Sequence, residues 1–191
     1  RKRFAVAAKA AIGELAASRV PESASLFIDS GTTCLALAER LVDRDDLTIY
    51  TNSFALRDLL ARARFRLILL GGEYRNVSHA LVGSIAEGQL MELRPDIAFL
   101  GASGLDSADG AFATEPSEAA IKRCALKVAR RSCLLADASK LSQTAAIRFA
   151  RWNQLSEWIT DGLPTPRPNV DAPLAVREAL ATKTPQSQST L

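Results

Sequence analysis

The chain has 191 residues, of which 48% are hydrophobic and 24% are charged, and it carries a net charge of +3. This length and composition fit one folded domain with its own core and hardly two. One histidine, His79, and three cysteines, at positions 34, 124 and 133, exclude a disulfide framework and a His/Cys zinc site. We therefore expect reduced thiols, no metal and no cofactor. No apolar run approaches the length of a membrane span, so we expect a cytoplasmic protein without a membrane partner.

Along the chain, short apolar runs alternate with segments in which apolar residues recur at helical spacing. The runs predict buried parallel strands, and the spacing predicts helices between several of them. The fold class is therefore α/β, an open and mostly parallel sheet with helices on both faces. The predicted strands are Leu26–Ile28, Leu47–Tyr50, Leu67–Leu70, Ile97–Leu100, Cys133–Ala136 and Trp158–Ile159. The helical patterns span Ala8–Leu15, Leu35–Val42, Leu56–Ala63 and Ile121–Val128.

Three segments depart from this alternation. The stretches Glu73–Gly83 and Gly101–Pro116 are polar or rich in glycine, and long irregular connections of this kind are usually functional loops. The prolines from Pro164 onward mark the start of a tail, in which Leu174–Ala181 forms a possible helix and the polar end is expected to be disordered. We therefore expect a folded α/β unit at 1–165 and a C-terminal segment at 166–191.

The sharpest local feature is the segment Asp29–Thr33, which lies directly after the first predicted strand and directly before a helix. Small residues allow a ligand to approach the backbone there, and the free N–H groups of the first helical turn bind anions. The alternative is an ordinary helix N-cap with nothing bound, because Ser and Thr favour that position. The segment lacks the lysine of a P-loop, which argues against a nucleotide triphosphatase.

Polar residues also follow the other predicted strands. Ligands in open α/β sheets bind beyond the carboxyl ends of the strands, so these residues should meet in one pocket. Each has a separate structural explanation as a cap, a turn residue or a surface charge. The residues are Asn52 and Ser53, Arg75 after two glycines, Gly101, and Asp137 with Lys140.

Positive residues are dispersed and gather only at Arg1–Arg3, Arg62–Arg66 and Lys122–Arg131, each time among apolar residues. Solvated helix faces explain these groups better than a nucleic-acid surface does. No recognition-helix pattern is present either. We therefore expect that these 191 residues do not read DNA by themselves.

Seven segments, in this order, carry a resemblance to a known family: IDSGTT, LTIYTNS, LLGGEYR, ALVGSIAEGQL, DIAFLGASGLD, LLADASK and ITD. The chain resembles the C-terminal sensor domain of DeoR-family transcription regulators over about Lys9–Leu163. The resemblance implies the fold of ribose-5-phosphate isomerase and the CoA transferases, and a sensor, not a catalyst, for phosphorylated sugars or related metabolites. It also implies a repressor that binds operator DNA only through an N-terminal winged helix-turn-helix, a part that we expect to be absent from these 191 residues.

The resemblance further implies roles for individual residues. Ser30–Thr33 would hold the phosphate, and Lys140 would add a second positive charge. Arg75 would clamp the phosphate or pair with an acidic surface residue. Four residues, Asp29, Asn52, Asp106 and Glu115, would accept hydrogen bonds from sugar hydroxyls. The alternative for Glu115, which precedes Pro116, is that it only starts the next helix. The predicted ligand site, without a catalytic residue, is Asp29, Ser30, Gly31, Thr32, Thr33, Asn52, Arg75, Gly101, Asp106, Glu115 and Lys140.

Two further expectations concern assembly and chemistry. A two-fold symmetric regulator matches the spacing of the half-sites in a symmetric operator, so we expect a homo-oligomer. Three aromatic residues, Phe4, Trp152 and Trp158, would line a subunit contact or, alternatively, pack within the domain. The alternative function is a sugar-phosphate isomerase or deaminase on the same scaffold, with Glu115 or Asp106 as general base. A solvated loop position is expected for His79, and a CoA transferase is the least supported alternative.

Overall fold

The computed structural model of the chain describes residues 2–59, 61–163 and 174–179. Its centre is a seven-stranded sheet in the order β12-β11-β9-β6-β1-β2-β3, and all neighbouring strands are parallel. All six predicted strands are confirmed as members of this sheet. The strands are β1 (Ser25–Ile28), β2 (Thr48–Thr51), β3 (Arg66–Leu69), β6 (Ile97–Gly101), β9 (Arg131–Leu135), β11 (Glu157–Thr160) and β12 (Ala175–Glu178).

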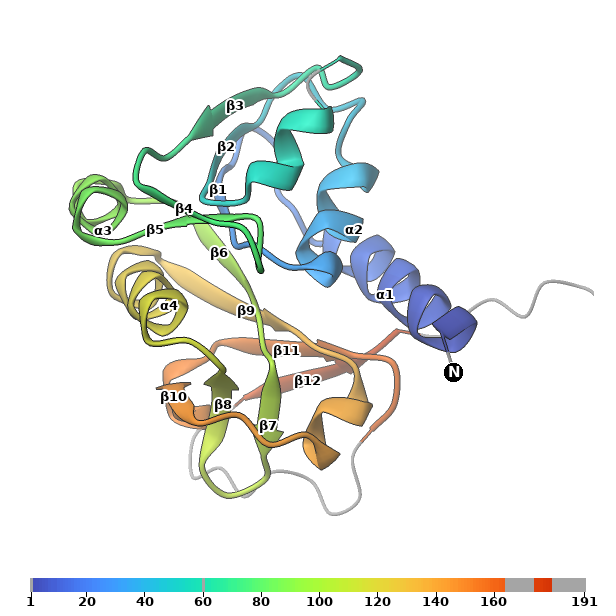
Figure 1. Cartoon of the computed structure of the whole chain (residues 1–191). Helices are drawn as coiled ribbons and strands as arrows, with labels where there is room; N and C mark the ends of the chain where they lie inside the picture. Colours follow the sequence, from blue (N-terminus) through green and yellow to red (C-terminus); the bar gives the residue numbers. More distant parts are fainter. Residues whose placement is uncertain (1, 60, 164–173, 180–191) are drawn as a thin grey trace, which may run out of the picture.

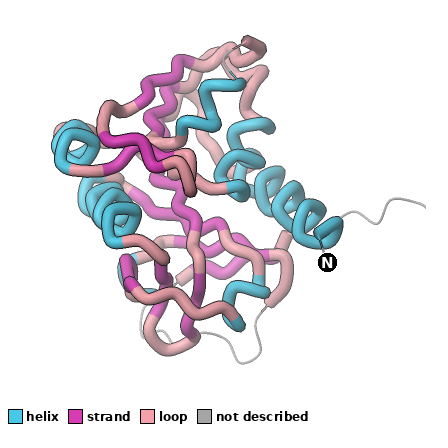
Figure 2. The backbone as a smooth tube through the Cα atoms, viewed as in Figure 1, coloured by secondary structure: helices cyan, strands magenta, loops and turns pink. Residues whose placement is uncertain are grey.

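Helices cover both faces of the sheet, which confirms the predicted fold class (Figures 1 and 2). The helices α1 (Lys2–Ala17) and α2 (Thr32–Arg40) lie on one face, and α3 (Ser84–Met91) and α4 (Pro116–Val128) lie on the other. The described helices include none that is long and apolar enough to cross a membrane.

The alternation of side chains along the central strands explains the two layers. In β1, Phe27 belongs to the core under α3 and α4, whereas Leu26 and Ile28 belong to the core under α1 and α2. All three are fully buried, because a parallel strand covered on both faces has no solvent side. The helices α1 and α2 also pack closely, since a Cβ on Gly13 would lie 2.7 Å from the carbonyl carbon of Ala36. A larger residue at position 13 would force the two helices apart.

The two stretches predicted as irregular loops instead contain short strands, which corrects that prediction. The first forms the hairpin β4 (Glu73–Arg75) and β5 (Ala80–Val82). The second forms β7 (Gly104–Asp106) and β8 (Gly110–Ala113), and β10 (Ile147–Ala150) completes a small antiparallel sheet. These strands have three or four residues, too few for an alternating apolar pattern to stand out in the sequence.

Two predicted helices also differ in the structure. The pattern Leu56–Ala63 forms only a 3₁₀ helix, η1 (Phe54–Leu59). Within the predicted helix Leu174–Ala181, Ala175–Glu178 form β12, which pairs in parallel with β11. Backbone bonds to the free edge of the sheet therefore outweigh the helical spacing. The rest of the tail predicted as disordered lies outside the described residues. Two more 3₁₀ helices are present, η2 (Ala138–Ser142) and η3 (Trp152–Gln154).

The two tryptophans pack inside the domain and not at its surface. Trp152 and Trp158 are 2% and 0% exposed, and their ring centroids are 5.2 Å apart. Their indole N–H groups donate to the carbonyls of Asp106 and Ala136, each at 2.9 Å. The alternative of ordinary packing therefore holds for both tryptophans. The side chain of Phe4, which was grouped with them, lies outside the described part of the structure.

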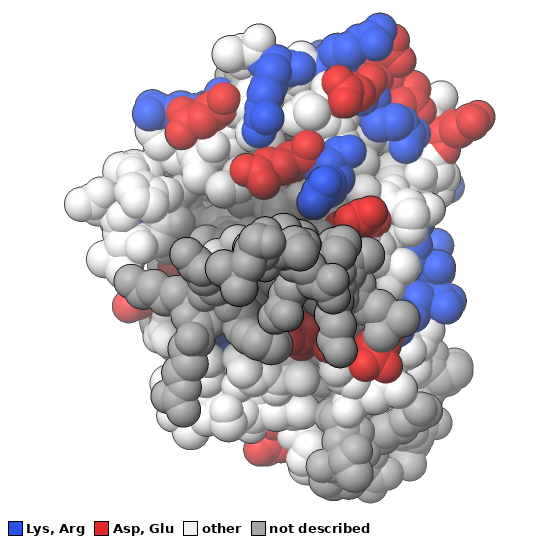
Figure 3. Space-filling view, turned by 90° about the vertical axis from the view of Figure 1, so that its right-hand side faces the viewer, with Lys and Arg blue, Asp and Glu red and all other residues white. Residues whose placement is uncertain are grey.

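Charges of both signs are mixed on the face of the molecule shown in Figure 3. Several charged residues of the chain pair locally: Arg44 bonds Asp46 and Arg64 bonds Asp45, each at 2.7 Å. Such exposed pairs contribute little stability. The pairing of Arg64 agrees with the solvated surface predicted for the group Arg62–Arg66.

Candidate ligand-binding site

The candidate site is a cavity of about 510 Å³ at the carboxyl ends of the strands, beside the N-terminus of α2. Its wall also includes residues of α1, α4, η2 and the turn between β4 and β5. The predicted site residues in the wall are Ser30, Gly31, Thr32, Thr33, Gly101 and Lys140. Wall residues outside the predicted site include Lys9, Ser78, His79, Ser103, Glu118 and Lys122.

The N-terminus of α2 is open toward this cavity. Gly31 is the N-cap residue, and no side chain caps the helix, so the ordinary Ser or Thr cap is not formed. Gly31 has φ = 124°, and a Cβ there would meet no atom within 4 Å. The positive φ requires glycine, and the open space leaves the first-turn N–H groups of Thr32 and Thr33 accessible to an anion.

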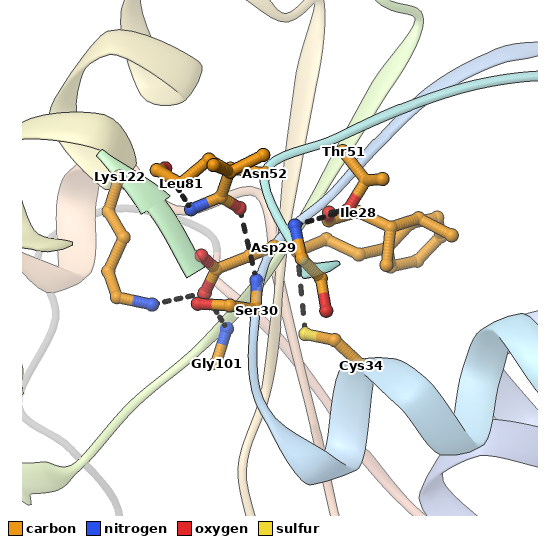
Figure 4. Close-up of polar contacts among 11 residues, drawn as sticks. Ile28, Asp29, Ser30, Cys34, Thr51, Asn52, Leu81, Gly101 and Lys122 are labelled. Carbon is orange, nitrogen blue, oxygen red and sulfur yellow. Dashed lines mark hydrogen bonds and ion pairs between the residues drawn. The ribbon is translucent and has the colours of Figure 1, made fainter. Parts of the chain in front are cut away.

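A buried ion pair lies beside the cavity. The ammonium of Lys122 bonds the carboxylate of Asp29, and Gly101 N donates to the same carboxylate oxygen at 3.1 Å (Figure 4). Asp29 is 1% and Lys122 is 4% exposed, and Lys122 Nζ lies 5.3 Å from the ring centroid of Phe149. Asp29 is therefore committed to a partner within the protein, and Lys122 is the member of the pair that lines the cavity.

Sequence reasoning missed Lys122, because it was grouped with the solvated residues Lys122–Arg131. One signal was available: Lys122 stands next to the buried Ile121 in a helix whose apolar residues define its inner face. A lysine at such a position is expected to have a buried partner. That partner, Asp29, could not be read from spacing along the chain.

Asn52 holds the turn before α2 in place through its side-chain amide. Its side-chain oxygen accepts a hydrogen bond from Ser30 N at 3.2 Å, and its amide group donates to Leu81 O at 3.3 Å (Figure 4). Thr51 Oγ1 donates to Ile28 O at 2.6 Å and so holds the ends of β1 and β2 together. The amide of Asn52 is thus used to position the turn before α2, and the residue does not line the cavity.

Besides Asp29 and Asn52, three more predicted site residues lie outside the cavity wall: Arg75, Asp106 and Glu115. Arg75 pairs with Glu115 at 3.0 Å, which is the alternative of an acidic surface partner. Asp106 accepts hydrogen bonds from the N–H groups of Ala108 and Asp109, each at 2.8 Å, and so closes the turn between β7 and β8. Sequence reasoning placed Arg75 near a strand end and Asp106 and Glu115 in an irregular stretch, but it could not tell which way these side chains point.

Two cations in the wall remain open to a ligand. Among the described residues, the side chain of Lys140 in η2 bonds only the neutral side chain of Gln143, at 2.9 Å. Lys9 comes from α1, and it makes no ion pair within the part of the chain that the structure describes. Lys9 was not predicted as a site residue, because it lies far from any strand end in the sequence.

The turn between β4 and β5 adds polar groups to the wall. Ser78 Oγ is buried and has no hydrogen-bond partner among the described residues. His79 is exposed, as expected, but it lines the cavity, and its Nδ1 lies 2.6 Å from the hydroxyl of Tyr74. An unpartnered hydroxyl in a cavity wall is available to a polar ligand.

Cys34 in the wall is not suited to nucleophilic chemistry. It is fully buried, and burial together with the nearby charge of Asp29 raises the pKa of its thiol far above the usual range. The neutral thiol is a poor nucleophile. In the described residues, no three His, Cys, Asp or Glu side chains gather in a way that could hold a metal ion.

Comparison with known proteins places this geometry in a family. The model of the DeoR C terminal sensor domain matches residues 5–162. The chain is 35% identical over 163 residues to the uncharacterized HTH-type transcriptional regulator YgbI of Escherichia coli, covering 84% of this chain and 64% of that protein. It is 30% identical over 165 residues to the glycerol-3-phosphate regulon repressor of the same species, covering 86% of this chain and 66% of the repressor.

A third relative, the HTH-type transcriptional repressor GlcR of Bacillus subtilis, is 33% identical over 154 residues, which cover 80% of this chain and 59% of GlcR. The chain therefore spans less than two thirds of the length of these three regulators.

Solved structures share the fold at low sequence identity. Ribose 5-phosphate isomerase A from Methanocaldococcus jannaschii aligns with a TM-score of 0.51 at 17% identity, over 69% of this chain and 52% of that chain. The translation initiation factor eIF-2B of Pyrococcus horikoshii aligns with a TM-score of 0.53 at 13% identity, over 72% and 48% of the two chains. These likenesses concern the fold alone. The family match and the relatives at 30% identity or more establish that the chain belongs to the family of DeoR C-terminal sensor domains.

Proposed function

We propose that the chain is the effector-sensing part of a DeoR-type transcription regulator and that its effector is a phosphorylated sugar or a related metabolite. One observation carries the proposal: an uncapped helix N-terminus at Gly31–Thr33 and two available cations, Lys9 and Lys140, line the same cavity. The helix dipole and two ammonium groups together favour a doubly charged phosphate. The phosphate would bind the N–H groups of Thr32 and Thr33.

The rest of the cavity suits hydroxyl groups. Ser78 Oγ lacks a partner within the described chain, and Glu118 and His79 supply further hydrogen-bonding groups. Lys122, held by Asp29, would donate to a sugar oxygen without leaving its partner, because an ammonium has three N–H bonds. Polar groups at fixed positions discriminate between stereoisomers that differ in one hydroxyl. The relative named as a glycerol-3-phosphate regulon repressor supports a phosphorylated ligand.

The regulatory role extends beyond the described residues and rests on the relatives. We propose that operator DNA is bound by a helix-turn-helix part corresponding to the additional length of the HTH-type relatives, that the whole protein is a cytoplasmic homo-oligomer, and that it acts as a repressor. The sensing unit predicted at 1–165 would then include β12 as the edge strand of its sheet.

Thermal-shift and calorimetric titrations with a panel of phosphorylated sugars and glycerol phosphate test the proposal, because a ligand that binds only the native state raises its stability. Each compound is paired with its unphosphorylated counterpart and with inorganic phosphate. We expect one phosphorylated compound to bind best, and we expect its affinity to fall in Lys140→Ala and Lys9→Ala. An affinity that is the same in both variants as in the wild type would contradict the proposal. So would an unphosphorylated compound that binds as tightly as its phosphorylated counterpart.

The alternative of an isomerase or deaminase has less support from the geometry. Its two candidate bases, Glu115 and Asp106, lie outside the cavity wall and are engaged elsewhere. We propose sensing without turnover. Incubating the chain with the best-binding sugar phosphate and following the sugar by NMR should show no conversion, and turnover abolished by Glu118→Gln would favour the enzyme.

A further inference from the structure

A second cavity, of about 550 Å³, lies between α4 and β10. The two cavities use different residues of α4: Glu118 and Lys122 line the first, whereas Arg123 and Lys127 line the second. The two cavities are therefore distinct, although residues of the same helix line both of them.

Positive charge is concentrated around this second cavity. Four cations line it, Arg123, Lys127, Arg148 and Arg151. Within the described chain only one carboxylate pairs with any of them, that of Asp109, which lies 3.1 Å from Arg148. The whole chain has a net charge of only +3, so the excess at this one place equals the net charge of the entire protein. Such a concave cluster of one sign attracts anions.

Two of the guanidinium groups are held in place before any ligand arrives. Arg123 Nη2 donates to the carbonyl oxygen of Arg148 at 2.8 Å, and Arg148 Nη1 donates to Asp109 Oδ1 at 3.1 Å. A guanidinium has five N–H donors, so each retains donors for a ligand. Fixing a long side chain in advance reduces the entropy lost on binding.

The floor of the cavity is apolar. Phe149 is 3% exposed, and Leu126 is half-buried against the core. Volume and lining fit a small molecule, since ligand sites occupy about 300–1,000 Å³ and combine apolar walls with a few polar groups. A nucleic-acid surface is instead an extended stripe of positive residues. The concave shape therefore favours a small ligand over a DNA backbone.

We propose that the cavity between α4 and β10 is a second binding site, which takes a small metabolite with two or more phosphate or carboxylate groups. The guanidinium groups of Arg123 and Arg148 bind one anionic group, in the geometry that suits phosphate and carboxylate. Lys127 and Arg151 neutralise the other. The site does not depend on the identity of the effector in the first cavity.

Calorimetric titration of the chain with pyrophosphate and with citrate tests the site. The variant Lys127→Gln/Arg151→Gln removes two exposed charges that take part in no ion pair within the described residues, so the fold should be retained. Arg40→Gln/Arg62→Gln removes two exposed charges outside both cavities and is the matched control. We expect saturable binding that weakens at least about tenfold, or about 1.4 kcal/mol, in the first variant and is unchanged in the control.

Two further variants locate the binding. Arg123→Gln/Arg148→Gln should weaken it as well, and Lys140→Ala, in the first cavity, should leave it unchanged. Binding lost in Lys140→Ala would place pyrophosphate in the first cavity and overturn the proposal. Equal affinity in all variants, or no saturable binding of either probe, would overturn it too. A short duplex DNA is the last probe. If it binds more tightly than pyrophosphate and citrate, and if this binding depends on Lys127 and Arg151, the ligand of the cavity is a nucleic acid and not a small molecule.

Discussion

Lys122 and Asp29, 93 positions apart in the sequence, form a buried ion pair between α4 and the end of β1. Gly101 N, from the end of β6, donates to the same carboxylate. One carboxylate thus connects three elements beside the cavity, and a ligand that contacts Lys122 acts on α4 and on the sheet together. The pair has a structural role and, under the proposed function, a binding role, and separate measurements can distinguish the two.

Breaking this pair should destabilise the fold. In Lys122→Met the carboxylate of Asp29 stays buried without its counter-ion, so we expect the free energy of unfolding to fall by about 3–5 kcal/mol. Asp29→Asn should have an effect of similar size. The double variant should lose clearly less than the sum of the two, because it leaves no unpaired charge. Urea unfolding measures all three, and additive losses would contradict a direct interaction.

A negative charge at the N-terminus of α2 should weaken effector binding without affecting the fold. Thr32 is exposed at the cavity wall, so Thr32→Glu places a carboxylate where the phosphate is proposed to bind. We expect the affinity for the best sugar phosphate to fall at least about tenfold, as measured by calorimetry. Thr32→Gln has nearly the same shape without the charge and is the control. Unchanged affinity in the glutamate variant would show that the phosphate binds elsewhere.

Asp96 should contribute to the acid sensitivity of the fold. Ser25 N and Ser25 Oγ donate to its carboxylate at 2.9 and 2.7 Å, and these hydrogen bonds lower the pKa of Asp96. Because the folded-state pKa is below the unfolded value of about 3.9, the stabilisation is present above that pH and is lost as the pH falls through the folded pKa. Since 40% of the side chain is exposed, we expect less than about 1 kcal/mol.

Unfolding of the wild type and of Asp96→Asn across the acid range measures this contribution. The difference between them should be largest near neutral pH and should shrink as the pH falls below about 4. Asp58→Asn, at an exposed carboxylate that bonds its neighbour Arg57, controls for the loss of one charge. A difference that is constant with pH would contradict the role of Asp96.

The chain should bind its effector without reading DNA. Its positive residues are mixed with acidic ones on the face of Figure 3, and the basic cavity beside α4 is not an extended stripe. Gel-shift assays with operator and scrambled duplexes at physiological salt should show no preference between them. A sequence-specific complex that resists salt, formed by these 191 residues alone, would disprove this expectation.

Self-association is a further expectation, drawn from the symmetry of operators. Since Trp152 and Trp158 are buried, a subunit contact must use other residues. Sedimentation at micromolar concentration, with and without the best sugar phosphate, measures the assembly. A strict monomer in both conditions would rule out an effector that acts through contacts between sensor domains.

The sequence by itself determined the layered fold and pointed to the helix N-terminus that lines the candidate cavity. Six apolar runs and the helical patterns around Leu37 and Ile121 predict a parallel sheet covered on both faces, because burial on each side imposes a period that can be read locally. The segment Ser30–Thr33, directly after a strand and before a helix, marks the start of α2, and the structure shows that no side chain caps it. These features depend on neighbours in the chain.

Only the tertiary structure decided which distant residues meet. Lys122 looked like one of several solvated cations until Asp29 was found beside it, and Lys9 entered the cavity wall only because α1 packs on α2. Arg75 pairs with Glu115 and does not line the cavity. Ala175–Glu178 pair with β11 and form the edge strand β12. Periodicity shows that a face is buried, but the partner of a buried or charged side chain is chosen by long-range packing, which a local pattern does not contain.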